Sequence, residues 1–235
     1  MKKYKIYICH YPPLIERKQY LDSILPNLDI DYEYSTQYTS YDSVYDNLFS
    51  SNHDDIKFKN ENSSVACNDF IFTNALKALC LEHINIYDKI NNENLDFGIV
   101  LEDDAVFVDD IKNRLHQTIN DLPKDPWDVI YITNGCEQRE KYLKLGRKGN
   151  PSINNFVKME IPYSWTGGGY IIKKETAKLF KDNIHPIVFP PDFELNYLQN
   201  RFNSNVYWLE NPIIYEGSNK VSKDKYRYKS SVNRE

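Results

Sequence analysis

Short apolar runs of strand length alternate along the chain with longer segments in which apolar residues recur at helical spacing. Lys5–Cys9, Phe97–Leu101 and Trp127–Thr133 are apolar enough to predict buried strands. The helical spacing is clearest in Val65–His83, whereas Tyr41–Ser64 is polar, lacks a period and predicts a long loop. Strands that alternate with helices predict a layered α/β domain with a predominantly parallel sheet.

The length and the charge balance restrict the kinds of protein that the chain can be. A chain of 235 residues, 41% of them hydrophobic, suffices for one domain with a full core, so we expect a single domain over residues 1–235. The net charge of −5 argues against a nucleic-acid partner, and only the tail, 220–235, is basic. No signal-peptide pattern and no apolar run of roughly 20 residues occurs, which predicts a soluble cytoplasmic protein without a transmembrane segment, at most peripheral to a membrane.

The Phe97–Leu101 run ends on three consecutive carboxylates, Glu102, Asp103 and Asp104. The carboxyl end of a buried strand is the edge at which open α/β sheets hold their ligands. Adjacent acids resist joint ionisation unless a cation or hydrogen bonds offset their charge, and oxygen donors of this kind suit Mg²⁺ or Mn²⁺. From these residues alone, a metal site and a solvated acidic turn are equally good interpretations.

Two later segments carry further candidate chemistry. Gly167–Gly169 precedes a strand, so it is either a flexible turn or a backbone that a ligand approaches closely, and not a dinucleotide fingerprint. Trp165 beside it is a candidate stacking face for a sugar ring, although such aromatic residues are more often core. Asp192 and Glu194 follow two rigid prolines and are candidate catalytic acids, and Asp192 is alternatively the N-cap of a Phe193–Phe202 helix.

Several of these segments occur in an order that is itself informative. The chain carries Leu-Glu-Asp-Asp-Ala at 101–105, a Glu-Arg pair at 16–17 and Asn-Pro-Ile-Ile-Tyr at 211–215. With Trp-Asp-Val-Ile-Tyr-Ile at 127–132, Pro-Tyr-Ser-Trp-Thr at 162–166 and Pro-Asp at 191–192, they resemble, collinearly, glycosyltransferase family 25, the lipooligosaccharide and procollagen galactosyltransferases. The likeness spans nearly the entire chain.

This resemblance implies a GT-A type, Rossmann-like single domain, a UDP-sugar donor, Mn²⁺ (or Mg²⁺) and transfer with inversion. It implies that Glu102 and Asp104 hold the metal against the diphosphate, with Ser218, Glu216 or water as a further ligand. Asp103 is expected to contact the donor ribose or to remain structural.

The remaining site residues follow from the same resemblance. Arg17 and the basic tail are expected to neutralise phosphate charge, and Gly167, Gly168 and Trp165 to bind the donor. A metal that stabilises the departing diphosphate leaves one base to be supplied, for which Asp192 is the first choice and Glu194 the second.

The expected reaction moves a hexose, with galactose favoured and glucose as the alternative, to an acceptor hydroxyl. That hydroxyl belongs either to a hydroxylysine of a collagen-like polypeptide or to a sugar of a surface glycan. Two other functions stay open: a non-catalytic nucleotide-sugar-binding protein, and a phosphoryl-transfer or nuclease-like enzyme that uses the same acids.

Overall fold

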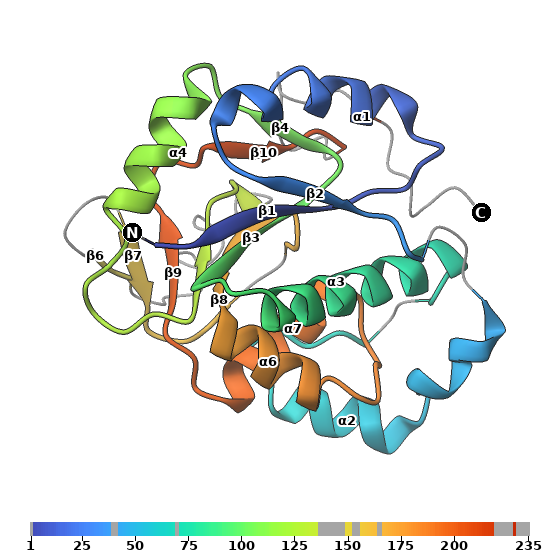
Figure 1. Ribbon diagram of the computed structural model, residues 1–235. Coiled ribbons are helices and arrows are strands. Elements are labelled where there is room, and N and C mark those ends of the chain that lie inside the picture. The colour runs from blue at the N-terminus through green and yellow to red at the C-terminus, as the bar shows by residue number, and fades with distance from the viewer. Residues whose placement is uncertain are drawn as a thin grey trace.

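A computed structural model describes residues 2–38, 42–68, 71–135, 149–151, 156–163, 166–218 and 228. Eight strands form the main sheet: β1 (Tyr4–Cys9), β2 (Tyr32–Ser35), β3 (Phe97–Glu102), β5 (Val129–Tyr131), β6 (Gly149–Pro151), β7 (Phe156–Met159), β8 (Gly169–Lys173) and β9 (Val206–Leu209). Their spatial order is β2-β1-β3-β8-β5-β9-β7-β6 (Figure 1). Strands β8 and β7 run opposite to all the others, so the predicted mixed, predominantly parallel α/β sheet is confirmed.

Helices cover both faces of this sheet (Figure 1). Those that lie on one side are α2 (His53–Glu61), α3 (Asn74–Asn92), α6 (Lys174–Asn183) and α7 (Pro191–Arg201), and those on the other are α1 (Ile15–Asp22) and α4 (Ile111–Asn120). Alternate residues of β1 point to opposite cores: Tyr7 and Cys9 pack on the α3 side, Ile6 and Ile8 on the α1 side. A sheet buried on both faces explains why the central strands read as continuous apolar runs.

A small second sheet brings a late segment of the chain next to the residues that follow β3. Strand β4 (Ala105–Phe107) pairs antiparallel with β10 (Ile214–Glu216), and Glu216 lies opposite Ala105 in the register. Residues that are more than 100 positions apart therefore meet immediately after the acidic run. No helix in the described part of the chain combines the length and the apolar character needed to cross a bilayer.

Three predicted elements differ from the structure. The polar stretch predicted as a loop holds α2 and a 3-10 helix, Ser43–Leu48, because the side chains of Asp42 and Asn52 accept hydrogen bonds from backbone N–H groups at their starts. Helix α3 begins later than predicted, at Asn74, where the Thr73 side chain accepts from the Leu76 N–H. Helix α7 begins at Pro191, so Asp192 lies within the first turn and the prediction that it is the N-cap is wrong.

Candidate functional site

Asp103, the middle acid of the run, is fully compensated. One of its carboxylate oxygens accepts from the Arg17 Nη1 at 2.6 Å. The other lies 2.9 Å from His10 Nδ1 and accepts from the Tyr11 N–H at 3.0 Å. Arg17 is itself buried, and its guanidinium lies over the Tyr228 ring. These contacts tie the turn after β1 to the end of β3, so Asp103 and Arg17 hold the fold together at this edge.

Asp104 is equally buried but only half satisfied. Its Oδ2 accepts hydrogen bonds from the Ser218 hydroxyl and N–H, while its Oδ1 has no hydrogen-bond partner among the described residues. Burial and then the charges of Glu102 and Glu216 raise the pKa of Asp104 to about 7. Because no Lys or Arg among the described residues forms an ion pair with it, this carboxylate is costly to ionise.

Glu102 lies beside Asp104 at the end of β3 and keeps 26% of its side chain exposed. Burial, followed by the charge of Glu216, raises the pKa of Glu102 to about 8. The backbone of Gly167 and Gly168 lies directly against these acids: a Cβ on Gly167 would be 2.7 Å from Glu102 Oε1, and one on Gly168 would be 2.9 Å from Glu216 Cγ. Both glycines are therefore needed for close approach of backbone to carboxylate.

Asp192 joins this acidic group from another element. It is half-buried in the first turn of α7, where its Oδ1 accepts from the Phe193 N–H at 3.0 Å. Burial first, and then the charge of Glu102, raises the pKa of Asp192 to about 7. Asp192 thus interacts electrostatically with Glu102, which also interacts with Asp104, and we refer to these three acids as the acidic cluster.

Glu194, the second candidate base, lies outside that cluster. Its Oε2 accepts from Lys59 Nζ at 2.7 Å, and its Oε1 accepts from the Val188 and Phe189 N–H groups at 2.7 and 3.0 Å. The side chain is 1% exposed. A carboxylate with every oxygen engaged and no access to solvent is poorly placed to take a proton from a substrate, so this geometry favours a structural role.

His83 was not among the predicted site residues, yet it lies against Glu102. Its Nε2 is 3.6 Å from Glu102 Oε1, and its Nδ1 is 2.9 Å from the Tyr170 hydroxyl. Burial lowers the pKa of His83 to about 4, so the ring is neutral at neutral pH. The sequence feature that could have identified His83 is its position on the apolar, inward face of the helix that precedes β3.

Glu102 and Asp104 suit a divalent cation that takes most of its ligands from the substrate and from water. Within the described residues, no group of three or more His, Cys, Asp or Glu side chains is arranged to hold a metal ion. Mg²⁺ commonly uses one or two carboxylates, and phosphates and water complete its shell. Glu102 and Asp104, with the unpartnered Oδ1 and raised pKa values, supply that donor set, whereas the Ser218 hydroxyl is engaged in orienting Asp104.

Some predicted residues lie outside the described part of the chain. They are Trp165 and the basic tail apart from Tyr228. The Tyr228 N–H donates to the Gly217 carbonyl at 2.9 Å, and the Gly217 N–H donates to the Asp104 carbonyl at 2.8 Å. Tyr228 is therefore attached to the same edge as the acids.

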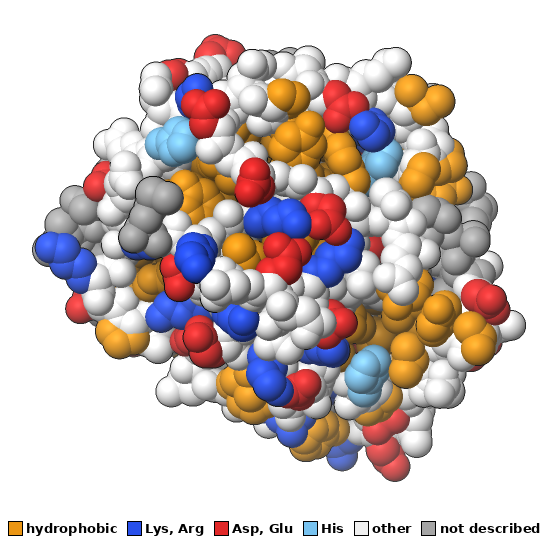
Figure 2. Space-filling view, in the orientation of Figure 1, with side chains coloured by type: hydrophobic (Ala, Val, Ile, Leu, Met, Phe, Trp, Pro, Cys, Tyr) orange, Lys and Arg blue, Asp and Glu red, His pale blue; other side chains and the backbone are white. Residues whose placement is uncertain are grey.

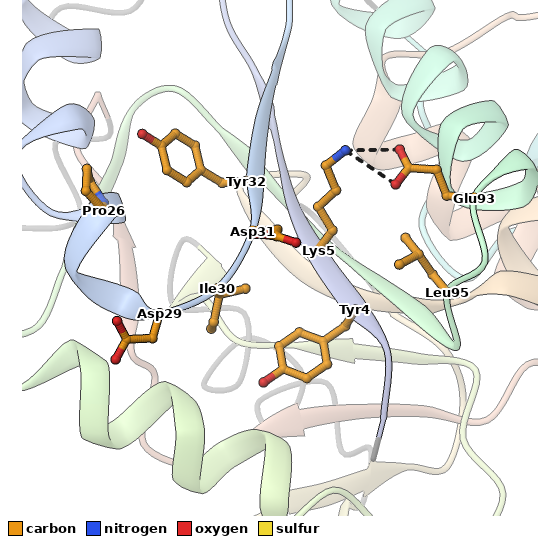
Figure 3. A pocket seen from close by; sticks show the side chains of 9 residues that line it. All are labelled: Tyr4, Lys5, Pro26, Asp29, Ile30, Asp31, Tyr32, Glu93 and Leu95. Carbon is orange, nitrogen blue, oxygen red and sulfur yellow. Dashed lines mark hydrogen bonds and ion pairs between the residues drawn. The ribbon is translucent and has the colours of Figure 1, made fainter.

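A pocket of about 530 Å³ lies elsewhere, at the amino ends of β1 and β2 (Figure 3). Tyr4 and Tyr32 flank it, and Lys5 Nζ reaches across to the Glu93 carboxylate. Because the acids follow the carboxyl end of β3, this pocket is at the opposite edge of the sheet. On the face in Figure 2, cationic and acidic side chains are interspersed, unlike the continuous basic surface that binds nucleic acid.

Comparison with known sequences identifies the family. A sequence model described as "Glycosyltransferase family 25 (LPS biosynthesis protein)" matches residues 5–195, which include the three acids after β3 and Asp192. The chain belongs to glycosyltransferase family 25. It is an α/β member of that family, which agrees with the resemblance that the sequence motifs indicated.

Curated relatives of this family 25 chain include animal enzymes. Procollagen galactosyltransferase 1-B of Xenopus laevis is 33% identical over 109 residues, which are 46% of this chain and 17% of the relative. Procollagen galactosyltransferase 1 of Danio rerio is 29% identical over 123 residues, which are 52% of this chain and 20% of the relative. The match thus spans a fifth or less of these relatives.

Solved structures share a distant likeness with this family 25 chain. Drosophila beta-1,4-galactosyltransferase 7, in complex with manganese, UDP-Gal and xylobiose, superposes with a TM-score of 0.43 at 9% identity, over 98% of this chain and 76% of that one. TarS of S. aureus superposes with a TM-score of 0.41 at 15% identity, over 95% and 63% of the two chains. A likeness at this level adds no argument about function.

Proposed function

We propose that this chain is a metal-dependent, inverting glycosyltransferase that moves a hexose, with galactose favoured, from a UDP-sugar to an acceptor hydroxyl. The observation that carries the proposal is the cluster of Glu102, Asp104 and Asp192, whose pKa values are raised by burial and by neighbouring carboxylates at the ligand-binding edge of the sheet. Membership of family 25 supports the reaction class. The names of the animal relatives support galactose, and UDP-glucose is the alternative donor.

Glu102 and Asp104 would hold Mn²⁺ or Mg²⁺ together with the donor diphosphate. When bound there, the metal supplies Lewis-acid stabilisation of the negative charge on the departing UDP. The cation would also remove the cost of ionising both acids, because their raised pKa values come from burial and from repulsion by neighbouring carboxylates, Glu216 in both cases. Ser218 keeps Asp104 oriented so that Oδ1 stays available.

Asp192 is the proposed base. It stands at the start of α7, half-buried, with one oxygen held by the Phe193 N–H and the rest of the carboxylate available to an acceptor hydroxyl. A pKa near neutrality suits a group that takes a proton as the hydroxyl attacks the anomeric carbon. The competing choice, Glu194, is already engaged by Lys59 and by two backbone N–H groups.

The other predicted binding residues act around these acids in our proposal. Gly167 and Gly168 would let the donor approach the backbone beside the acids, since a side chain at Gly167 would collide with Glu102 and one at Gly168 with Glu216. Asp103 anchors Arg17, and that buried pair fixes the turn after β1 along the same edge. The acceptor is proposed as a hydroxylysine of a collagen-like polypeptide or a sugar of a surface glycan.

The test is a panel of UDP-sugars incubated with the purified chain, candidate acceptors and Mn²⁺, with release of UDP as the measurement. We expect the fastest release from UDP-galactose, loss of release in EDTA and recovery when Mn²⁺ is restored. Binding of UDP and Mn²⁺ by calorimetry without release from any UDP-sugar would contradict an enzyme and support the non-catalytic binding protein. Cleavage of a nucleic acid in the same buffer would support a phosphoryl-transfer enzyme instead.

A further inference from the structure

His83 has one buried ring nitrogen with no hydrogen-bond partner among the described residues. The residue is 4% exposed, and this atom, Nε2, faces the Glu102 carboxylate at 3.6 Å. A Cβ on Gly167 would be 3.5 Å from the same nitrogen, so backbone encloses it on that side. A polar atom that is buried, unpartnered and directed at an acid of the proposed metal site requires an explanation.

The other ring nitrogen begins a chain of buried hydroxyls. Nδ1 lies 2.9 Å from the Tyr170 hydroxyl, which lies 2.9 Å from the Tyr87 hydroxyl. Tyr170 belongs to β8, next to β3, and Tyr87 belongs to α3, one turn after His83. The two tyrosines are buried in the core between α3 and the sheet, so this chain is held rigidly from the back of the site.

The direction of the hydrogen bonds in this chain follows from electrostatics. When Glu102 is ionised, as holding a cation requires, a proton on Nδ1 alone would leave the lone pair of Nε2 facing a carboxylate oxygen, and the two would repel each other. If Nε2 carries the proton, it can donate to Glu102, Nδ1 accepts from the Tyr170 hydroxyl, and Tyr170 accepts from Tyr87. In that arrangement every group is paired in the way that its chemistry allows.

We infer that His83 is a positioning residue for Glu102: its Nε2–H donates to the carboxylate, and Tyr170 holds the ring in the tautomer that permits this. The separation of 3.6 Å exceeds hydrogen-bond length by about half an ångström. The Glu102 side chain is the more exposed of the two. Its rotation would bring the carboxylate within hydrogen-bond distance of Nε2. The inference rests on the proposed function for its purpose, since an oriented Glu102 is useful because it holds the metal.

The first test reads the tautomer directly and needs neither metal nor turnover. Nitrogen-15 NMR of the histidine side chains distinguishes a protonated from an unprotonated ring nitrogen. Above the pKa of Glu102, where that carboxylate is ionised, we expect His83 to carry its proton on Nε2 in the wild-type protein, and Tyr170→Phe to shift its population toward Nδ1–H. A wild-type His83 protonated on Nδ1 alone would overturn the inference, whatever the enzyme does.

The second test measures the consequence for the metal. Groups that orient a metal ligand typically contribute 10–100-fold to metal affinity. With UDP present, we expect His83→Leu, which removes the donor, to weaken Mn²⁺ binding roughly 10-fold by electron paramagnetic resonance of free Mn²⁺. His83→Gln restores an N–H donor at a similar position and should recover most of that loss.

The matched control is Tyr207→Phe, which removes the hydroxyl of another buried tyrosine, on β9, outside the His83 chain. It should leave Mn²⁺ affinity unchanged, whereas Tyr170→Phe should weaken it several-fold. Equal losses in His83→Gln and His83→Leu would show that packing, not hydrogen bonding, matters and would overturn the inference. Absence of any Mn²⁺ binding by the wild type would instead contradict the proposed function, and the tautomer would still decide the role of His83.

Discussion

Asp103 and Asp104 are neighbours in the chain and are 5% and 4% exposed, yet they occupy opposite electrostatic environments. Asp103 meets a guanidinium, a histidine ring and a backbone N–H, whereas Asp104 has one oxygen held by Ser218 and one without a partner among the described residues. The same contrast separates Glu194, which is paired with Lys59, from Asp192 two residues earlier. Burial alone therefore does not separate these acids, whereas the partners of each carboxylate do, and our proposal assigns function to the acids without an ion-pair partner among the described residues.

This difference has an energetic basis. A buried carboxylate is expensive unless a cation and hydrogen bonds replace its lost hydration. Asp103 and Glu194 have those partners inside the protein, so their charges stabilise particular contacts. Glu102, Asp104 and Asp192 form no ion pair with a Lys or Arg among the described residues, and burial and neighbouring carboxylates raise their pKa values. Burial raises the pKa of Glu194 too, but there Lys59 and the backbone N–H groups counteract it. Acids without such an ion pair are suited to a partner that arrives with the substrate.

The largest expected effect is at Asp104. Asp104→Asn keeps the shape of the side chain but removes the charge that would hold the metal, so metal-dependent UDP release should fall by roughly 10³-fold or more. Release of UDP from UDP-galactose measures this. The control is Asp109→Asn, which alters an exposed acid five residues later and should leave the rate unchanged. Near-normal turnover in Asp104→Asn would contradict the proposal that Asp104 holds a metal that the reaction requires.

Asp192→Asn should separate binding from chemistry. The amide cannot take a proton, so transfer should fall at least about 10²-fold while the dissociation constant for UDP-galactose stays nearly unchanged. Calorimetry and a transfer assay measure the two quantities. Asp182→Asn, at an exposed acid late in the neighbouring helix α6, serves as the control. A parallel loss of donor affinity would place Asp192 in donor binding instead.

Removing the cation that pairs with Glu194 should lower the stability of the folded protein. Lys59→Met leaves the Glu194 carboxylate buried without its cation, and we expect a loss of about 3–5 kcal/mol in the free energy of unfolding by urea denaturation. Lys57→Met on the same helix breaks an exposed pair with Glu61 and should cost less than about 1 kcal/mol. Equal losses of unfolding free energy in the two variants would show that the buried pair contributes no more to stability than the exposed pair does.

The smallest expected effect is the pH dependence of the metal-free protein. Because the folded-state pKa values of Glu102 and Asp104 are raised to about 8 and about 7, the native state binds more protons than the unfolded chain between about pH 4 and 8. The contribution of these acids to stability is thus present at low pH and is lost as pH rises through the folded-state values.

The measurement is the melting temperature across that range. In the metal-free wild type, these acids should lower it by a few degrees between about pH 5 and 8. Glu102→Gln should flatten the profile, and Mn²⁺ with UDP should reverse its slope. A Glu102→Gln profile that matches the wild-type profile would show that the acid is already compensated.

The fold was largely predictable from the sequence because burial leaves a periodic signature. The buried runs in β1, β3 and β5 were predicted, and so was the position of the acids at the end of β3. Helix α2 was not predicted, because its sequence is polar and its one buried side chain is Lys59. A pattern of apolar residues cannot reveal a lysine that is buried by an ion pair.

The partners of the acids were beyond such reasoning. Arg17 and Asp103 are 86 positions apart, and Lys59 and Glu194 are 135 positions apart. His83 reaches Glu102 only because α3 packs on the sheet beside β3. No local pattern indicates which of several nearby acids such a distant group compensates.

The sequence by itself therefore determined the alternation of strands and helices, the family 25 motifs and the edge at which the acids gather. Tertiary structure decided which acids form an ion pair with a Lys or Arg among the described residues and which do not. The physical reason is that hydrophobic periodicity is a local property of the chain, whereas charge compensation depends on through-space contacts between segments that only folding brings together.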